Sequence, residues 1–260
     1  VYALGATGVL SCIEGDSGER AWTVNILELM GVAPETDTRA VAWGRSASPL
    51  VVGDLVVVPV GGPENGPWFS LAAFDKNDGK ILWKKGDCQV SYCSPSLEVL
   101  FDRQQIVIVN ESSVSGHRPA DGEQLWSHPW QGDSSSLASS SQAVVLSGDR
   151  VLLSKDYGIG AELLQLTSND VDGIEAEVVW SKRQILKTKF TNVVVIDSSV
   201  YGLSDGILEC VDVDTGERLW RDRRAGDFGH GQILAVGDVI LVQAESGEVV
   251  MVDVNPNEFK

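Results

Sequence analysis

A repeated segment restricts the fold of this chain more than any other feature of its sequence. Residues 8–22 (GVLSCIEGDSGERAW) align without gaps with residues 206–220 (GILECVDVDTGERLW), and eight of the fifteen positions are identical. Shorter copies that keep a Gly four residues before a Trp end at Trp83 and Trp126, and a weaker copy runs through Asp172 and Gly173 to Trp180. The recurring positions are Gly18, Trp22, Gly79, Trp83, Gly122, Trp126, Trp180, Gly216 and Trp220. A segment that recurs along a chain predicts a repeat architecture, in which each copy packs on its neighbours.

Each copy predicts an antiparallel hairpin. Residues 208–213 alternate as a strand with one buried face does, residues 214–216 form a tight turn, and residues 217–220 return as the next strand. Several copies follow two more strand-like runs that are joined by a Gly-Asp turn, so four strands are expected per repeat. The Trp-to-Trp spacing of 40 to 61 residues fits one blade of a β-propeller. Because the tryptophans recur at one position, we expect them to pack between blades.

We therefore expect the 260 residues to form one all-β propeller domain of four-stranded antiparallel blades. The first repeat lacks its leading strand and the last lacks its Trp strand, so about six blades or part-blades are expected. This count predicts a portion of a larger propeller, truncated at both ends. Residues 27–42 are an insertion expected on one rim, where residues 26–30 predict a short helix and residues 34–37 a loop.

Composition excludes several classes of partner. The chain has 37 acidic and 20 basic residues, for a formal net charge of -17, so a nucleic acid backbone would be repelled. No apolar run approaches the roughly 18 residues of a membrane span, and no charged leader with an apolar region follows Val1. We expect no nucleic acid partner and no membrane-spanning segment.

Catalytic and metal motifs are not found. The sequence has no G-x-S-x-G motif and no Gly-rich phosphate loop, and its three histidines share no metal-ligand spacing. No catalytic residue and no metal ligand is therefore assigned. Cys12 and Cys210 occupy equivalent repeat positions and are expected in the core, whereas a disulfide between Cys88 and Cys93 stays open.

The loops that precede the first strand of each repeat are the candidate ligand site. In a propeller these loops converge on one end of the central channel. We expect the mouth of the channel to be lined by Trp43, Arg45, Tyr92, Lys189 and His230. Arg45 and Lys189 would supply cationic hydrogen-bond donors in an otherwise acidic chain. Ordinary polarity of exposed loops is the alternative explanation for the same residues.

The repeat resembles the pyrroloquinoline quinone (PQQ)-type propeller repeat, Asp-x-x-Thr-Gly-x-x-x-Trp, which residues 212–220 match. Over essentially the whole chain it is similar to the exported propellers related to the outer-membrane β-barrel assembly lipoprotein, which have about eight blades. This resemblance implies a non-catalytic scaffold in the periplasm or cell envelope that presents rim loops and the channel mouth to a protein or envelope partner. It leaves the oligomeric state open.

Two other functions remain open at this point. Some PQQ-type propellers are alcohol dehydrogenases that use PQQ with calcium and a vicinal cysteine pair, and this sequence has no Cys-Cys dipeptide. Enzymatic activity is therefore disfavoured, and no cofactor is expected outside that alternative. The second alternative is a carbohydrate- or polymer-binding propeller that uses tryptophans outside the repeat, such as Trp43 and Trp68.

Overall fold

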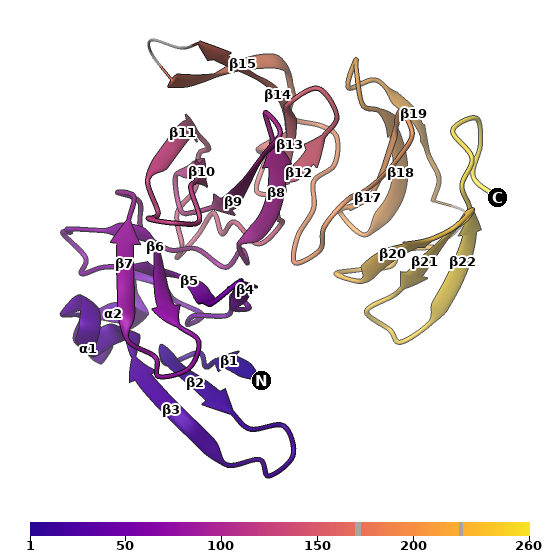
Figure 1. Cartoon of the computed structure of the whole chain (residues 1–260). Helices are drawn as coiled ribbons and strands as arrows, with labels where there is room; N and C mark the ends of the chain where they lie inside the picture. Colours follow the sequence, from indigo (N-terminus) through magenta and orange to yellow (C-terminus); the bar gives the residue numbers. More distant parts are fainter. Residues whose placement is uncertain (170–172, 224–225) are drawn as a thin grey trace. The chain divides into compact units, whose positions relative to one another are not determined.

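The computed structural model describes residues 1–169, 173–223 and 226–260, so the predicted turn residue Asp172 lies outside the described part. The described residues form six antiparallel sheets and two short helices (Figure 1). The chain divides into two compact units, residues 1–139 with 168–175 (unit 1) and residues 140–167 with 176–260 (unit 2).

Blades 1 to 3 contain eleven strands, and both helices lie between blades 1 and 2 in the sequence. Blade 1 consists of β1 (Tyr2–Leu4), β2 (Val9–Ile13) and β3 (Arg20–Asn25). The helices are α1 (Ile26–Met30) and α2 (Pro34–Ala40). Blade 2 consists of β4 (Leu50–Val52), β5 (Leu55–Gly61), β6 (Phe69–Asp75) and β7 (Ile81–Lys85). Blade 3 consists of β8 (Ser96–Leu100), β9 (Arg103–Val109), β10 (Ser113–His117) and β11 (Gln124–Pro129).

Blades 4 to 6 contain the other eleven strands. Blade 4 consists of β12 (Val144–Leu146), β13 (Arg150–Lys155), β14 (Gly160–Asn169) and β15 (Gly173–Lys182). Blade 5 consists of β16 (Val194–Ile196), β17 (Ser199–Ser204), β18 (Ile207–Asp212) and β19 (Arg218–Arg221). Blade 6 consists of β20 (Gln232–Val236), β21 (Val239–Gln243) and β22 (Val249–Asp253).

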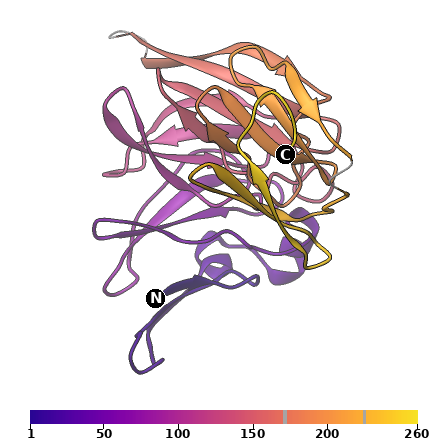
Figure 2. The same cartoon turned by 90° about the vertical axis from the view of Figure 1, so that its right-hand side faces the viewer.

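Every sheet is a meander in which each strand pairs with the next one along the chain. Figure 2 shows the same strands from a second side. Blades 2 to 5 have four strands, and blades 1 and 6 have three. The prediction of all-β, four-stranded antiparallel sheets is therefore confirmed. The three strands of blade 1 correspond to the second to fourth of a full blade, and those of blade 6 to the first to third, as the repeat predicts.

The tryptophans link successive blades within each unit. Trp22, Trp83, Trp180 and Trp220 each donate the indole N–H to a backbone carbonyl just after the third strand position of the following blade: Lys76 at 3.0 Å, Pro119 at 3.2 Å, Val213 at 3.0 Å and Asn255 at 2.8 Å. Trp126 instead bonds Gln105 of its own blade at 2.9 Å. In the full hairpins of blades 1, 2, 3 and 5, a β-bulge follows the residue that pairs with the Trp.

Glycine is required where a tryptophan ring covers the turn. Gly122 has a φ of +71°, and a Cβ atom built on it would lie 2.4 Å from the Trp83 ring. The same distance is 2.7 Å for Gly79 under Trp22 and 2.8 Å for Gly216 under Trp180. Gly18 has the same positive φ, +72°, but no atom lies within 4 Å of its Cβ position. The spacing of Gly and Trp in the repeat is therefore a packing requirement as well as a turn requirement.

The insertion contains a second helix where a loop was predicted. α1 begins at a cap in which Asn25 Oδ1 accepts the backbone N–H of Leu27 at 3.0 Å, and it ends at Gly31 with φ +69°. The expectation of a loop at residues 34–37 is wrong, because Pro34 occupies the first helical position of α2, where its missing N–H costs nothing. Leu27 and Met30 of α1 pack with Val58 and Phe74 of blade 2 in a buried apolar cluster.

Candidate functional site

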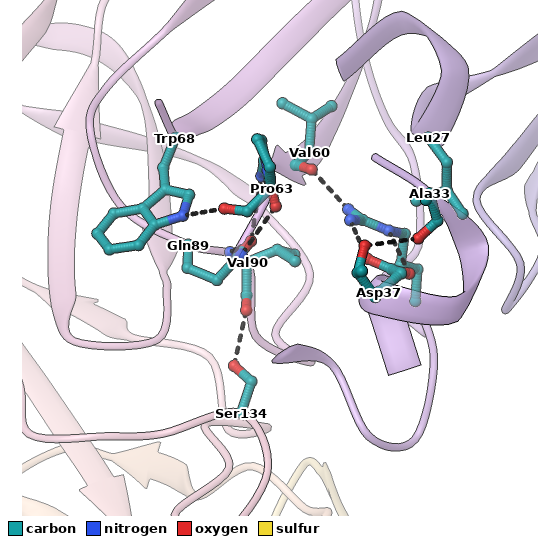
Figure 3. A network of polar contacts seen from close by, with 12 residues as sticks. Leu27, Ala33, Asp37, Val60, Pro63, Trp68, Gln89, Val90 and Ser134 are labelled. Atoms are coloured by element: carbon teal, nitrogen blue, oxygen red, sulfur yellow. Dashed lines mark hydrogen bonds and ion pairs between the residues drawn. The ribbon is translucent and has the colours of Figure 1, made fainter. Parts of the chain in front are cut away.

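Three loops of unit 1, residues 43–48, 89–94 and 134–139, each precede the first strand of a blade and form one connected surface. We call it the leading-loop surface. The backbone N–H of Ser48 donates to Ser94 Oγ at 2.8 Å, and that of Tyr92 donates to the Ser139 carbonyl at 2.9 Å. The hydroxyl of Ser134 donates to the Val90 carbonyl at 2.7 Å (Figure 3). Hydrogen bonds thus connect the loops of successive blades across this surface.

An exposed tryptophan lies on this surface beside a tyrosine. The side chain of Trp43 is 60% exposed, and its ring centroid lies 5.6 Å from that of Tyr92. The Tyr92 hydroxyl accepts the backbone N–H of Trp43 at 3.2 Å and donates to the Ser134 carbonyl. The structure therefore brings together two of the five predicted residues. Trp43 presents a large apolar face on a backbone held by hydrogen bonds.

Arg45 lies in the same loop but points inward. Its side chain is 1% exposed and forms an ion pair with Asp37 of α2, with Nη2 and Oδ1 2.7 Å apart. Nη1 also donates to the Val60 carbonyl at 2.6 Å, at the end of β5 (Figure 3). This buried cation connects the insertion to blade 2. Its guanidinium is therefore engaged inside the protein and does not supply a donor facing solvent.

The other two predicted residues lie in unit 2. The Lys189 ammonium is 4.8 Å above the Tyr157 ring and 3.3 Å from the Asp156 carboxylate. The His230 ring meets the edge of Phe190, with centroids 5.3 Å apart, and Phe190 is 52% exposed. Each unit thus carries an exposed aromatic residue on a loop that precedes a first strand. Phe190 was missed in the sequence because it lies outside the repeat, next to the predicted Lys189.

A small polar cavity of about 160 Å³ adjoins the leading-loop surface in unit 1. Trp68 lies on its wall and donates its indole N–H to the Pro63 carbonyl at 2.8 Å (Figure 3). Glu111 and Asp133 also line it; burial raises the pKa of the Glu111 carboxyl, and hydrogen bonds from Ser135 lower the pKa of Asp133. The carboxylates and the indole make this cavity suited to basic or hydroxylated groups, and Arg39 on its edge adds one cationic donor.

A comparison with models of known protein families identifies the family of this chain. The family model of the outer membrane protein assembly factor BamB matches residues 1–222. The chain belongs to this family. Of the solved structures, BamB from Moraxella catarrhalis is similar with a TM-score of 0.64 and 17% identity, over 98% of this chain and 70% of that one. A europium-containing methanol dehydrogenase is similar with a TM-score of 0.69 and 11% identity. The match covers 99% of this chain and 66% of the dehydrogenase chain.

At these identities the structural similarity establishes the fold, which is the predicted β-propeller built from PQQ-type repeats. No curated protein sequence matches the chain. Neither helix within the described residues has the length and apolar character needed to cross a membrane.

The residues do not fit PQQ and its calcium ion. Within residues 1–169, 173–223 and 226–260, no group of three His, Cys, Asp or Glu side chains is arranged to hold a metal ion. All four cysteines are free thiols, and Cys88 and Cys93 are both buried. Burial also raises the pKa of the Cys93 thiol to about 12, so it stays protonated at neutral pH. We derive no redox chemistry for this site.

Proposed function

We propose that this BamB-family chain is a non-catalytic binding propeller whose leading-loop surface docks an envelope protein through Trp43. Family membership supports a role in outer membrane protein assembly, and with it a location in the periplasm or cell envelope. The observation that carries the proposal is the exposed indole of Trp43, held over Tyr92 on a surface fixed by hydrogen bonds between loops.

An exposed tryptophan on a fixed backbone has the properties of a binding hot spot. Tryptophan is enriched among the residues that contribute most to protein interfaces, because it buries a large apolar area and also offers an N–H donor. The structure records no hydrogen bond for the Trp43 indole N–H among the residues it describes. Since the loop is already ordered by Tyr92 and supported by Arg45, little conformational entropy would be lost on binding.

The charge of the chain indicates the kind of partner. The net charge is -17, and the cavity that adjoins the leading-loop surface is lined by Glu64, Glu111 and Asp133. A partner surface with lysine or arginine around an apolar pocket would match both features, and long-range attraction would increase the association rate. The proposed partner is therefore a basic envelope protein with an apolar pocket for the indole.

Site-specific photocrosslinking tests this proposal. A photoreactive phenylalanine would replace Trp43 in the full-length protein in its own cells, and the same group would replace Leu82 as the control. Leu82 lies on β7 of the same unit and is 53% exposed, so it presents a similar apolar side chain on a different surface. We expect position 43 to crosslink to a component of outer membrane protein assembly and position 82 not to.

Equal crosslinking from both positions, or none from position 43, would reject docking through Trp43. A second assay addresses catalysis: purified protein with PQQ, calcium, an alcohol and an artificial electron acceptor. We expect no turnover above the protein-free mixture. Turnover that depends on PQQ would replace the binding proposal with a dehydrogenase.

A further inference from the structure

Unit 2 contains a cavity of about 490 Å³ in which basic side chains gather. Lys187, Arg221 and Arg223 line it together with Asp205 and Asp227. These five residues carry one excess positive charge, in a chain whose net charge is -17. Such a concentration of cations in an acidic protein creates a local attraction for anions.

Not all of these cations are neutralised by neighbouring carboxylates. Lys187 forms an ion pair with Asp205. Arg221 donates through Nη2 to the Ser204 carbonyl at 2.8 Å, but its buried Nε has no hydrogen-bond acceptor. For Arg223 the structure records neither an ion pair nor a side-chain hydrogen bond with any described residue.

Glu209 forms a long ion pair with Arg221 and shorter contacts with other groups. Glu209 Oε2 lies 3.7 Å from Arg221 Nε, which is close enough for an ion pair and too long for a hydrogen bond. Glu209 instead accepts the Arg218 Nε–H at 2.8 Å and the backbone N–H of Leu186. Because Nε is buried against Glu209, the guanidinium donor of Arg221 that remains for a ligand is Nη1, for which the structure records no hydrogen bond with any described residue.

We propose that this cavity binds a small ligand through an oxyanion group, a carboxylate or a phosphate. Guanidinium groups bind such oxygens through charge-assisted hydrogen bonds, and here Nη1 of Arg221 and the guanidinium of Arg223 have no recorded hydrogen bond with a described residue. The cavity is larger than one anion, and the buried side chain of Ile207 on its wall offers an apolar contact for the rest of the ligand. This site is in unit 2 and is independent of the docking proposed for Trp43.

The first test is a titration of the full chain with inorganic phosphate, and separately with acetate, at constant ionic strength. Amide chemical shifts measured by NMR would report binding, and we expect the largest changes at Gly226, Asp227 and Gly229. Saturation by phosphate alone would assign the site to phosphate groups, and saturation by acetate alone to carboxylates. Absence of saturable changes at these amides with both anions would overturn the proposal.

Two variants with opposite expected effects make the test specific. R223A should weaken binding about tenfold, because it removes an unpaired donor. D227N should tighten binding about threefold, because it removes a repelling charge and keeps an oxygen that accepts the Gly229 N–H. R103A is the matched control, since Arg103 is an exposed arginine on β9 in unit 1. If R223A and R103A weaken binding equally, the effect is one of net charge and the site is rejected.

Discussion

The contact between Gly122 and the Trp83 ring makes a quantitative prediction for the substitution Gly122→Ala. Gly122 has φ +71°, so any L-residue there costs roughly 1–2 kcal/mol in the left-handed region. The new Cβ would also lie 2.4 Å from the rigid Trp83 ring, which is buried, and overpacking of this kind costs roughly 1–3 kcal/mol. We therefore expect Gly122→Ala to lower the free energy of unfolding by about 3 kcal/mol.

Gly18→Ala separates the two contributions. Gly18 has nearly the same φ, +72°, and its backbone N–H makes the same turn hydrogen bond, at 2.9 Å against 2.8 Å for Gly122. No atom lies within 4 Å of its Cβ position, so only the backbone cost remains, about 1–2 kcal/mol. Both glycines lie in unit 1, and urea unfolding followed by tryptophan fluorescence would measure both variants under one condition. Equal destabilisation of the two variants would refute the packing explanation.

Two further predictions concern buried charges. Arg45→Met leaves the Asp37 carboxylate buried without its partner, so we expect the free energy of unfolding, measured in urea, to fall by about 3–5 kcal/mol. The double variant Arg45→Met/Asp37→Leu should recover much of this loss, because it also removes the unpaired carboxylate. A loss smaller than that of the exposed variant Arg103→Met would contradict the role of this ion pair. Burial lowers the pKa of Lys155 from 10.5 to about 8, so the unfolded chain keeps this proton to higher pH and the free energy of unfolding should rise between those values. Lys155→Met should lack this rise in a pH series of unfolding curves, and an unchanged pH dependence would show that another group titrates.

The fold could be predicted because the residues that determine it recur. Gly122 and Trp83 are far apart in sequence, but each belongs to a repeat in which the same residue types return at the same positions. α2 could not be predicted in this way, since the insertion has no second copy in the chain to compare with. The helix begins at Pro34 because proline is favoured at the first helical position. The residues around Pro34 are typical of turns, so the sequence indicated a loop instead.

The candidate site was predictable only in part, for a related reason. Trp43 and Tyr92 were found because loops before first strands lie at one end of a blade, which is a property of the repeat. The partner of Arg45 was missed, because Asp37 lies in the insertion and only the tertiary structure brings the two together. Arg221 and Arg223 were assigned no role from the sequence, because they follow Trp220 and lie outside the repeat.

The indole bonds between successive blades end on main-chain oxygens, and this choice of acceptor has an evolutionary consequence. Trp220 bonds the Asn255 carbonyl in a segment where Pro256 and Asn257 stand in place of the Thr-Gly turn sequence. Every residue has a peptide oxygen, whatever its side chain. The sequence of a duplicated blade can therefore change at almost every position, and the blade can still accept the indole N–H of the preceding blade. Two blades can then pack together if one supplies the Trp ring and the other leaves space for that ring over its turn. Such arrays can therefore gain or lose blades with few changes at the contacts between blades.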